Sequence, residues 1–217
     1  MAPESFRNAD AGIVVLEMIA VIRENAKRLS EIDGAIGDGD HGINMGKGFG
    51  QCGERIASSP GSLADNLRTL GNVLLTEIGG AMGPLYGTLF LEMANAGNKE
   101  ELITGEVFGR MLERAAAGVV ELGNAKIGDK TMIDALAPAA DAYTRSMRAG
   151  GSFAVSLSAM AEAAEKGMES TRGMAARVGR ASRLGERSRG TLDPGAASCA
   201  LLLGTMARAM TALLGAG

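Results

Sequence analysis

Apolar residues recur every three or four positions along most of the chain, which is the spacing of a helix with one buried face. In the first such segment, 10–32, charged residues occupy the opposite face. Its apolar positions are Ile13, Leu16, Ala20, Ile22, Ala26 and Leu29. No segment shows the sustained two-residue alternation of β-branched residues that is typical of a strand. The pattern therefore predicts an all-α protein without strands.

Capping residues and glycines divide this pattern into eight predicted helices. Side chains suited to an N-cap open several of them: Ser62, Thr104, Thr131, Ser152 and Asp193. Proline follows Asp193 at the first helical position, where it is favoured. The predicted helices cover 10–32, 43–58, 62–78, 83–96, 104–122, 131–148 and 152–177, and the eighth begins at 193–194.

The connectors between these helices are short, so consecutive helices are expected to be antiparallel neighbours. The predicted fold is one domain over 1–217, an eight-helix antiparallel up-and-down bundle or barrel. Alternate connectors of such a fold gather at one end. Four alternate connectors are rich in Gly, Asp and Arg: 33–42, 79–87, 123–131 and 179–195. We therefore expect a site at one rim of the bundle.

Composition excludes several classes of partner. A net charge of −3 gives no reason to expect a nucleic acid or an anionic membrane. The apolar run 195–207 is shorter than the roughly 18 residues of a membrane span and predicts a buried helix. The N-terminus lacks the apolar region of a signal peptide. Cys52 and Cys199 are expected to be free buried thiols in a reducing compartment, which favours a cytoplasmic protein.

The most informative stretch is EIDGAIGDGDHG at 31–42. Asp33, Asp38 and Asp40 fall within eight positions, among four glycines and beside the only histidine. Like charges this close repel one another unless a cation lies among them. Three carboxylates without a thiolate suit Mg²⁺ or Ca²⁺ rather than zinc. A plain Asp-Gly turn is the alternative, but three aspartates together favour a metal site.

Two common loops do not fit this stretch. Counted from Asp38, an EF-hand would need a ligand at Gly42 and a closing Glu at Phe49. A Walker A loop would need Ser or Thr after Lys47 and glycine at His41.

Mg²⁺ held by few carboxylates takes further ligands from phosphates and water. Three carboxylates and a nucleoside triphosphate of about −4 charge are balanced by two Mg²⁺ and one or more arginines. The stretch therefore predicts phosphate at the N-terminus of the following helix.

The other three connectors leave alternatives open. GGAMGPLYG at 79–87 suits close helix packing and nucleotide contact about equally. Taken alone, Asp129 is expected to cap locally and Lys130 to be solvated. Arg180 is one of four arginines in ten residues, and phosphate pairing is favoured over a solvated basic loop because a metal site is expected at the same end. His41 is better placed to orient a ligand or phosphate than to carry a phosphoryl group.

Four stretches together resemble the nucleotide-binding, L-type subunit family of bacterial dihydroxyacetone kinases: IDGAIGDGDHGINM, GGAMGPLYGT, GDKTMID and GRASRLGERSRGTLDPGA. The match in order and spacing covers nearly the whole chain. The resemblance implies an eight-helix barrel that binds ADP or ATP with Mg²⁺ at one rim. It implies that Asp33, Asp38 and Asp40 hold the magnesium, two ions by the charge balance, and are catalytic together with Arg180. The implied nucleotide contacts are His41, Gly42, Ile43, Asn44, Met82, Gly83, Gly123, Met132, Arg180, Asp193, Pro194 and Gly195.

Two positions depart from the family's usual motifs. Met82 stands where the family has a serine, which removes a hydroxyl and leaves only a backbone contact to phosphate. Arg183 stands where an aromatic residue is usual. This second departure bears on the phosphoryl donor or on the surface that meets the partner subunit.

The resemblance also implies partners. A separate K-type subunit would bind the small ketose through a histidine, and this chain would depend on it because its own histidine belongs to the nucleotide rim. That partner would select the ketose, either dihydroxyacetone or a four-carbon ketose such as erythrulose. The donor is free ATP or a phosphohistidine protein that recharges bound ADP. A homodimer stays open.

Two other functions fit parts of the sequence. A non-catalytic module that uses bound ADP to dock a regulator would account for Met82, but the intact aspartates argue against it. The kinase domain of a fatty-acid kinase shares the nucleotide-binding fold. The chain is expected to lack the further domains that such a kinase needs.

Overall fold

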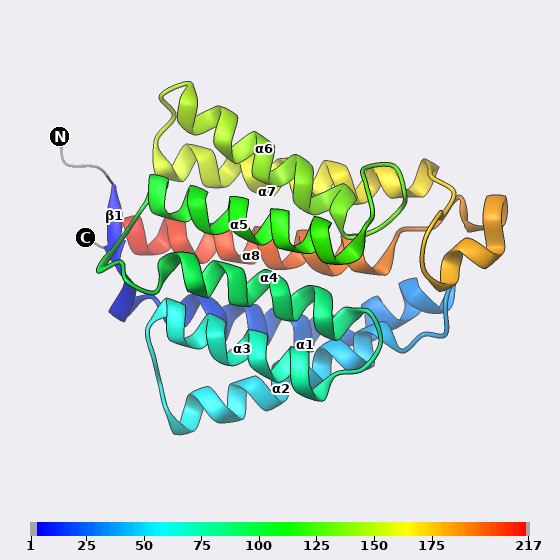
Figure 1. The fold of residues 1–217 in the computed structure, drawn as a ribbon, viewed down its shortest axis with the longest axis horizontal. Helices are drawn as coiled ribbons and strands as arrows, with labels where there is room; N and C mark the ends of the chain where they lie inside the picture. Colours follow the sequence, from blue (N-terminus) through cyan, green and yellow to red (C-terminus); the bar gives the residue numbers. More distant parts are fainter. Residues whose placement is uncertain (1–3, 216–217) are drawn as a thin grey trace.

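Eight α-helices dominate the structure, a computed structural model that describes residues 4–215 (Figure 1). They are α1 Ile13–Gly34, α2 His41–Ser58, α3 Leu63–Glu77, α4 Met82–Gly97, α5 Gly105–Gly123, α6 Ile133–Arg148, α7 Phe153–Ser170 and α8 Pro194–Gly215. Three 3₁₀ helices accompany them: η1 Asn8–Asp10, η2 Thr171–Gly173 and η3 Arg180–Ser188. The predicted all-α class is confirmed.

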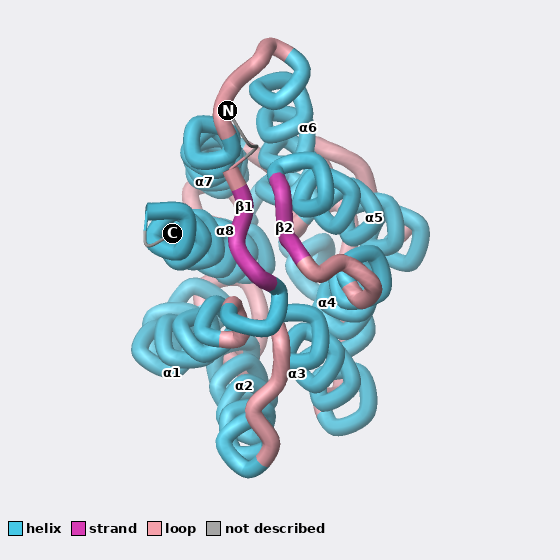
Figure 2. Tube along the Cα trace, turned by 90° about the vertical axis from the view of Figure 1, so that its left-hand side faces the viewer, coloured by secondary structure: helices cyan, strands magenta, loops and turns pink. Residues whose placement is uncertain are grey.

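The helices run alternately up and down and form a closed ring, which Figure 2 shows almost end on. Each helix packs against the next one in the chain, and α8 packs against α1 to close the ring. The even-numbered helices therefore begin at the rim where the odd-numbered helices end, on the right in Figure 1. This arrangement is the predicted up-and-down barrel.

Local capping sets several of the helix starts that the sequence predicted, but not that of α6, which begins at Ile133 after Met132 rather than at a Thr131 cap. At α3 the Ser62 hydroxyl accepts the backbone N–H of Asp65 (3.1 Å), and the Asp65 carboxylate accepts the N–H of Ser62 (3.2 Å). This reciprocal pair is a capping box. Thr104 and Ser152 cap α5 and α7 in the same sense, each accepting an N–H from three residues further on. These caps are confirmed.

The core contains mainly aliphatic side chains and methionines, and α8 contributes many of them. Cys199, Leu203 and Met210 are each at most 2% exposed. By length and composition α8 could cross a membrane, since an 18-residue window has a mean hydropathy of 1.5, but 61% of that window is buried inside the fold. The helix is longer than the run 195–207, and it packs against α7, α1 and α6 as a core helix does.

The expectation of no strands is wrong. Ser5–Arg7 (β1) pairs antiparallel with Leu102–Thr104 (β2), with Phe6 opposite Ile103. The pair lies at the rim opposite the one where the even-numbered helices begin (Figure 2). Strands of three residues are too short to show an alternating pattern in a sequence.

The seventh helix is also shorter than expected, since it ends at Ser170 rather than near 177. The hydroxyl of Thr171 donates to the carbonyl of Met168 (2.6 Å), and the chain tightens into η2 before it leaves the bundle. The first helix starts three residues later than expected because η1 precedes it.

Candidate functional site

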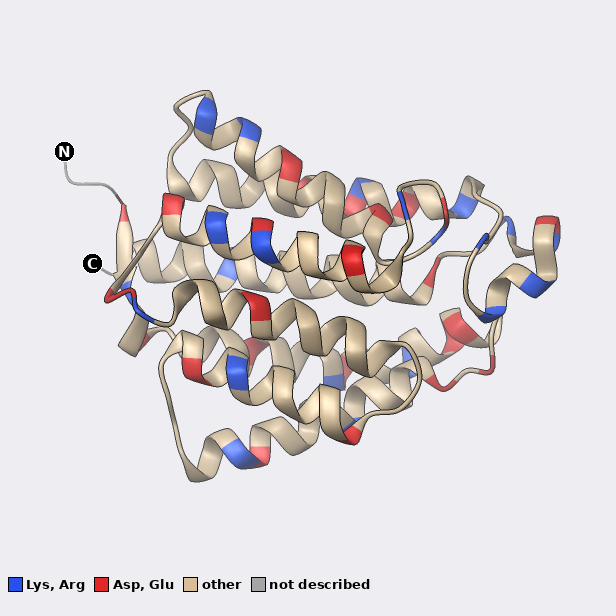
Figure 3. Cartoon of the chain, viewed as in Figure 1, with Lys and Arg blue, Asp and Glu red and all other residues tan. Residues whose placement is uncertain are grey.

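The four predicted connectors meet at one rim, on the right in Figure 1. As observed, they are 35–40, 78–81, 124–132 and 171–193. Figure 3 shows that acidic residues of the first connector lie close to basic residues of the last. We call the last connector, 171–193, the strap.

Asp33, Asp38 and Asp40 come together as predicted. One carboxylate oxygen from each lies within 4.8 Å of the other two. Asp33 is in the last turn of α1 and is only 9% exposed, whereas the other two carboxylates are exposed on the loop. Three hard oxygens without a thiolate fit Mg²⁺, and the exposed side leaves access for phosphate and water as further ligands.

Glycines allow the chain to bring these carboxylates so close. Gly39 has φ +77°, in the left-handed region that glycine adopts without strain. A Cβ atom on Gly37 would collide with the carboxylate of Asp33. The backbone N–H of His41 then donates to Oδ2 of Asp33 (3.2 Å), which ties the start of α2 to the end of α1.

His41 begins a chain of hydrogen bonds that joins three helices. Its Nε2 lies 2.8 Å from the hydroxyl of Ser198 on α8, which lies 2.7 Å from the hydroxyl of Tyr86 on α4. Tyr86 is also within 3.0 Å of the carbonyl of Gly195, to which it can donate. Burial lowers the pKa of His41 to about 4, although Asp33 opposes this shift. The imidazole is therefore neutral at pH 7.

Helix N-termini lie at this rim, and helix N-termini are suited to anions. The first turn of every helix has backbone N–H groups without a partner inside the helix, and the helix dipole is positive there. α2, α4 and α8 begin at His41, Met82 and Pro194. The Met82 side chain is partly buried against the core. Backbone N–H groups of Gly42–Ile43 and Met82–Gly83 are therefore suited to phosphate, as in other helix N-terminal anion sites, whereas the N–H groups of His41 and Asn44 already donate to Asp33 and Asp40.

The remaining predicted contacts also lie at this rim. A Cβ atom on Gly195 would lie 3.4 Å from Cβ of Met132, so the third connector touches the start of α8. Gly123 ends α5 and faces Leu85 of α4. Ile43 is 66% exposed on the first turn of α2. Contact of these residues with a nucleotide stays a prediction.

The strap brings Arg180 to the acidic loop. Arg180 forms an ion pair with Asp38, and its guanidinium is therefore beside the carboxylates expected to hold metal and phosphate. Gly179 precedes η3 with φ +68° and Gly185 interrupts it with φ +53°, so the arginine-rich segment is a kinked turn rather than a regular helix. Arg183 is exposed there.

Lys130 is not solvated, contrary to the expectation. It is 2% exposed and adopts a left-handed conformation with φ +63°. Its ammonium donates to the carbonyls of Thr171 and Thr191, both at 2.6 Å. The prediction was wrong because these acceptors come from the strap, 41 and 61 positions further along the chain. Asp129 caps locally as predicted, accepting the N–H of Lys126 (3.0 Å).

Asp193 caps α8 as predicted, with Oδ2 accepting the N–H of Ala196 (2.7 Å). Burial raises the pKa of this carboxyl to about 7, against the opposing effects of the Ala196 N–H and the Lys130 ammonium. Because the pKa of this half-buried cap is near neutral, the stability of the fold should depend on pH.

The substitution Asp193→Asn should remove a pH dependence. The carboxyl of Asp193 binds its proton more tightly in the folded state than in the unfolded chain. The resulting stabilisation of the folded state is therefore fully present below about pH 3.8 and is lost as the pH rises through about 7. Over that range, the free energy of unfolding of the wild type should fall relative to the variant, by at most about 1.4 kcal/mol per pH unit. Asn caps helices as well as Asp does. Urea titrations of both proteins across the range measure the difference, and parallel pH profiles would contradict the assignment.

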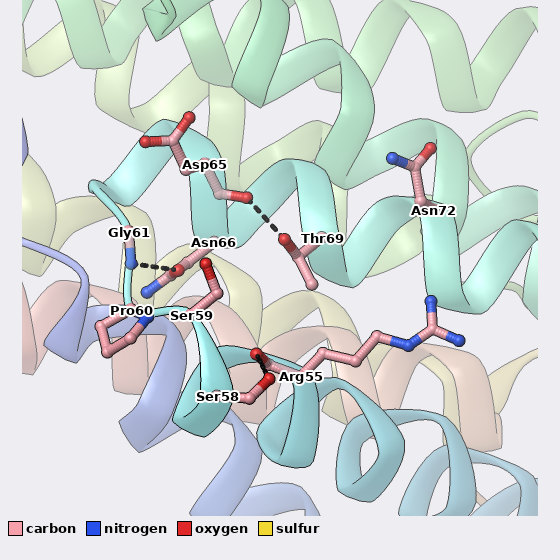
Figure 4. A pocket seen from close by; sticks show the side chains of 9 residues that line it. All are labelled: Arg55, Ser58, Ser59, Pro60, Gly61, Asp65, Asn66, Thr69 and Asn72. Carbon is pink, nitrogen blue, oxygen red and sulfur yellow. Dashed lines mark hydrogen bonds between the residues drawn. The ribbon is translucent and has the colours of Figure 1, made fainter.

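A cavity of about 530 Å³ lies at the other rim, between the end of α2 and the start of α3 (Figure 4). Its polar groups are bonded locally. Oδ1 of Asn66 accepts the N–H of Gly61 (3.2 Å), and the Thr69 hydroxyl donates to the carbonyl of Asp65 (3.0 Å). None of the predicted site residues lines it. This cavity therefore lies apart from the candidate site, which is marked by its gathering of charged groups.

Ser198 and Tyr86 were not predicted as site residues from the sequence. Each is a polar side chain within an apolar helix, and the sequence therefore indicates that its buried hydroxyl needs a hydrogen-bond partner. The sequence does not indicate which residue that partner is. Here the partner of Ser198 is His41, 157 positions away in the sequence.

Fold and site together define an all-α up-and-down barrel with an acidic loop and several helix N-termini at one rim, an arrangement suited to a metal ion with phosphates. Residues 35–208 match the DAK2 domain, and the chain belongs to this family. The resemblance inferred from the motifs is thereby confirmed.

Relatives of similar length strengthen the assignment. The chain is 39% identical over 186 residues to the ADP-binding subunit DhaL of PEP-dependent dihydroxyacetone kinase 1 from Listeria innocua, covering 85% of this chain and 88% of the relative. It is 38% identical over 190 residues to the corresponding DhaL subunit from Escherichia coli, covering 87% and 90%.

A solved structure has the same fold. The dihydroxyacetone kinase from C. freundii, in complex with AMP-PNP and Mg²⁺, superposes with a TM-score of 0.69 at 23% sequence identity. The superposition covers 96% of this chain but only 36% of that larger protein. At this identity the likeness supports the fold.

Proposed function

We propose that this protein is the ADP-binding subunit of a dihydroxyacetone kinase, which receives a phosphoryl group and passes it to a ketose held on a separate K-type subunit. The observation that carries the proposal is the 38–39% identity, over most of both chains, to subunits named for that role. The three carboxylates at the rim agree with it.

Each group at the rim has a role in this proposal. Asp33, Asp38 and Asp40 would hold two Mg²⁺ ions, which would neutralise negative charge on the transferring phosphoryl group. Arg180 would add a further positive charge from the strap. Neutral His41 orients the loop that faces the phosphates, and first-turn N–H groups donate to phosphate oxygens. The protein thus acts mainly by positioning and charge stabilisation.

The donor in this proposal is a phosphohistidine protein rather than free ATP. Similar subunits are described as parts of PEP-dependent or PTS-dependent kinases and as ADP-binding. ADP held at this rim would supply the phosphoryl-carrying chemistry between the phosphohistidine donor and the ketose hydroxyl. The first-turn N–H groups, Arg180 and the three carboxylates would hold and orient it there.

Dihydroxyacetone is favoured over erythrulose as the acceptor. Relatives named D- or L-erythrulose kinases are 28–34% identical, and the chain spans 32–37% of their length. The free buried cysteines agree with a cytoplasmic setting.

The test combines native mass spectrometry with reconstitution. We expect purified protein to carry ADP that resists dialysis in the presence of Mg²⁺. Supplied with a K-type subunit and a PEP-charged donor protein, it should phosphorylate dihydroxyacetone without added ATP. A protein that exchanges ADP freely and works only with ATP would overturn the donor assignment. Bound ADP without any transfer, with partners active toward a known DhaL subunit, would instead favour a regulatory module.

A further inference from the structure

The strap leaves α7 and returns to α8, and its two legs lie side by side at their base. The N–H of Gly190 on the returning leg donates to the carbonyl of Arg172 on the outgoing leg (2.8 Å). The Ser188 hydroxyl accepts the N–H of Ala176 (2.8 Å). These bonds hold the legs to each other but do not fix them to the bundle.

Lys130 supplies that attachment. Its ammonium donates to Thr171 on the outgoing leg and to Thr191 on the returning leg. Both bonds are charge-assisted and the side chain is 2% exposed, so water cannot readily replace either one. Thr171 is itself fully buried, and its hydroxyl accepts the N–H of Asp193 (3.0 Å). One ammonium therefore fixes both ends of the strap to the start of α6.

The position of Lys130 is energetically costly, which indicates that the bonds of its ammonium have a role. A lysine with φ +63° is held in a conformation that non-glycine residues rarely adopt, and its charge is removed from water. Burial lowers the pKa of Lys130, while Asp193 and Asp134 oppose the shift. A second, weaker tie joins the same connector to the strap, since the carbonyl of Asp129 accepts the N–H of Arg177 (3.1 Å).

We propose that Lys130 is a positioning residue for the nucleotide site, because its ammonium clamps both legs of the strap and thereby sets the place of Arg180 above the acidic loop. The consequence for ADP rests on the proposed function, whereas the clamp itself does not. The ammonium of Lys130 donates to backbone carbonyls of the strap and not to Asp33, Asp38 or Asp40. Its effect on ADP must pass through the strap.

Limited proteolysis with trypsin tests the clamp directly, because trypsin cleaves after arginine and the strap carries Arg180, Arg183 and Arg187. Lys130→Met keeps the side-chain stem and the backbone preference but removes the ammonium. We expect cleavage within the strap to be about tenfold faster or more in this variant. Lys126→Met removes an exposed charge from the same connector and should be cleaved like the wild type.

A double-mutant cycle then tests the route to ADP. In the Mg²⁺-bound protein, Lys130→Met should raise the Kd for ADP about tenfold in the wild-type background but less than about threefold in an Arg180→Ala background. A merely structural role would give the same factor in both. Lys130→Gln can donate to one carbonyl at a time and should fall between the wild type and Lys130→Met, so it carries both tests if the methionine variant does not fold.

The results of these experiments distinguish the clamp, the positioning role and the proposed function from one another. Wild-type cleavage rates in the folded variants would overturn the clamp. Faster cleavage with equal ADP factors in both backgrounds would overturn the positioning role. A wild-type protein that does not bind ADP at all would refute the proposed function and the positioning role with it, while the cleavage result would still decide the clamp.

Discussion

Replacing one carboxylate of the acidic loop, in Asp38→Asn, should abolish most phosphoryl transfer to the ketose. The amide keeps the shape of the side chain but removes the negative charge that a hard cation requires. Loss of metal assistance costs several kcal/mol of transition-state stabilisation, and each 1.36 kcal/mol is tenfold in rate. We therefore expect a loss of about a hundredfold or more in the reconstituted assay.

Asp38 is a better choice than Asp33 for this experiment. Oδ2 of Asp33 accepts the N–H of His41, so its replacement would also disturb the junction of α1 and α2. The carboxylate of Asp38 is about half exposed and pairs with Arg180. Asp10→Asn is the matched control, since Asp10 is exposed near the opposite rim. Calorimetric titration with Mg²⁺ gives an independent readout, and full activity with weakened Mg²⁺ binding would refute the metal role.

The acidic loop could be predicted because its chemistry is local. Asp33, Asp38 and Asp40 lie within eight positions, and the spacing alone places them together. The caps of α3, α5 and α7 are local for the same reason, since each bond joins residues three positions apart. Helical periodicity then predicted the up-and-down order that brings the four connectors to one rim.

What could not be predicted depends on contacts between distant segments. Lys130 was expected to be solvated because that is the usual state of a lysine taken alone, whereas its acceptors lie on the strap, far along the chain. The β1–β2 pair joins segments almost a hundred positions apart through strands of three residues each. The end of α7 was misplaced because the chain keeps a helical composition beyond Ser170, where tertiary contacts of Thr171 decide the boundary.

Glycines in α2 also differ in contacts with distant segments that the sequence does not reveal. Gly42 and Gly50 are both in α2, and the sequence does not indicate which of them packs closely against another helix. A Cβ atom on Gly42 would overlap the carbonyl oxygen of Ala26 and lie 2.6 Å from the backbone nitrogen of Ser30, both on α1. A Cβ atom on Gly50 would meet nothing within 4 Å.

The same substitution at these two positions should therefore have opposite effects. Gly50→Ala should stabilise the protein by up to about 1 kcal/mol, the usual gain of alanine over glycine in a helix. Gly42→Ala must push α2 away from α1, because backbone atoms cannot rotate out of the way. We expect a loss of at least about 3 kcal/mol in the free energy of unfolding, which lowers the urea midpoint by roughly 1–2 M.

Gly42→Ala should also weaken Mg²⁺ and ADP binding, because the displaced α2 carries His41 and its bond to Asp33. Urea unfolding followed by circular dichroism measures stability, and calorimetry at low temperature measures binding in the folded fraction. A gain in stability at both positions would mean that α1 and α2 are further apart than described. A loss at Gly42 without any change in Mg²⁺ binding would instead mean that the acidic loop keeps its geometry independently of the helix that follows it.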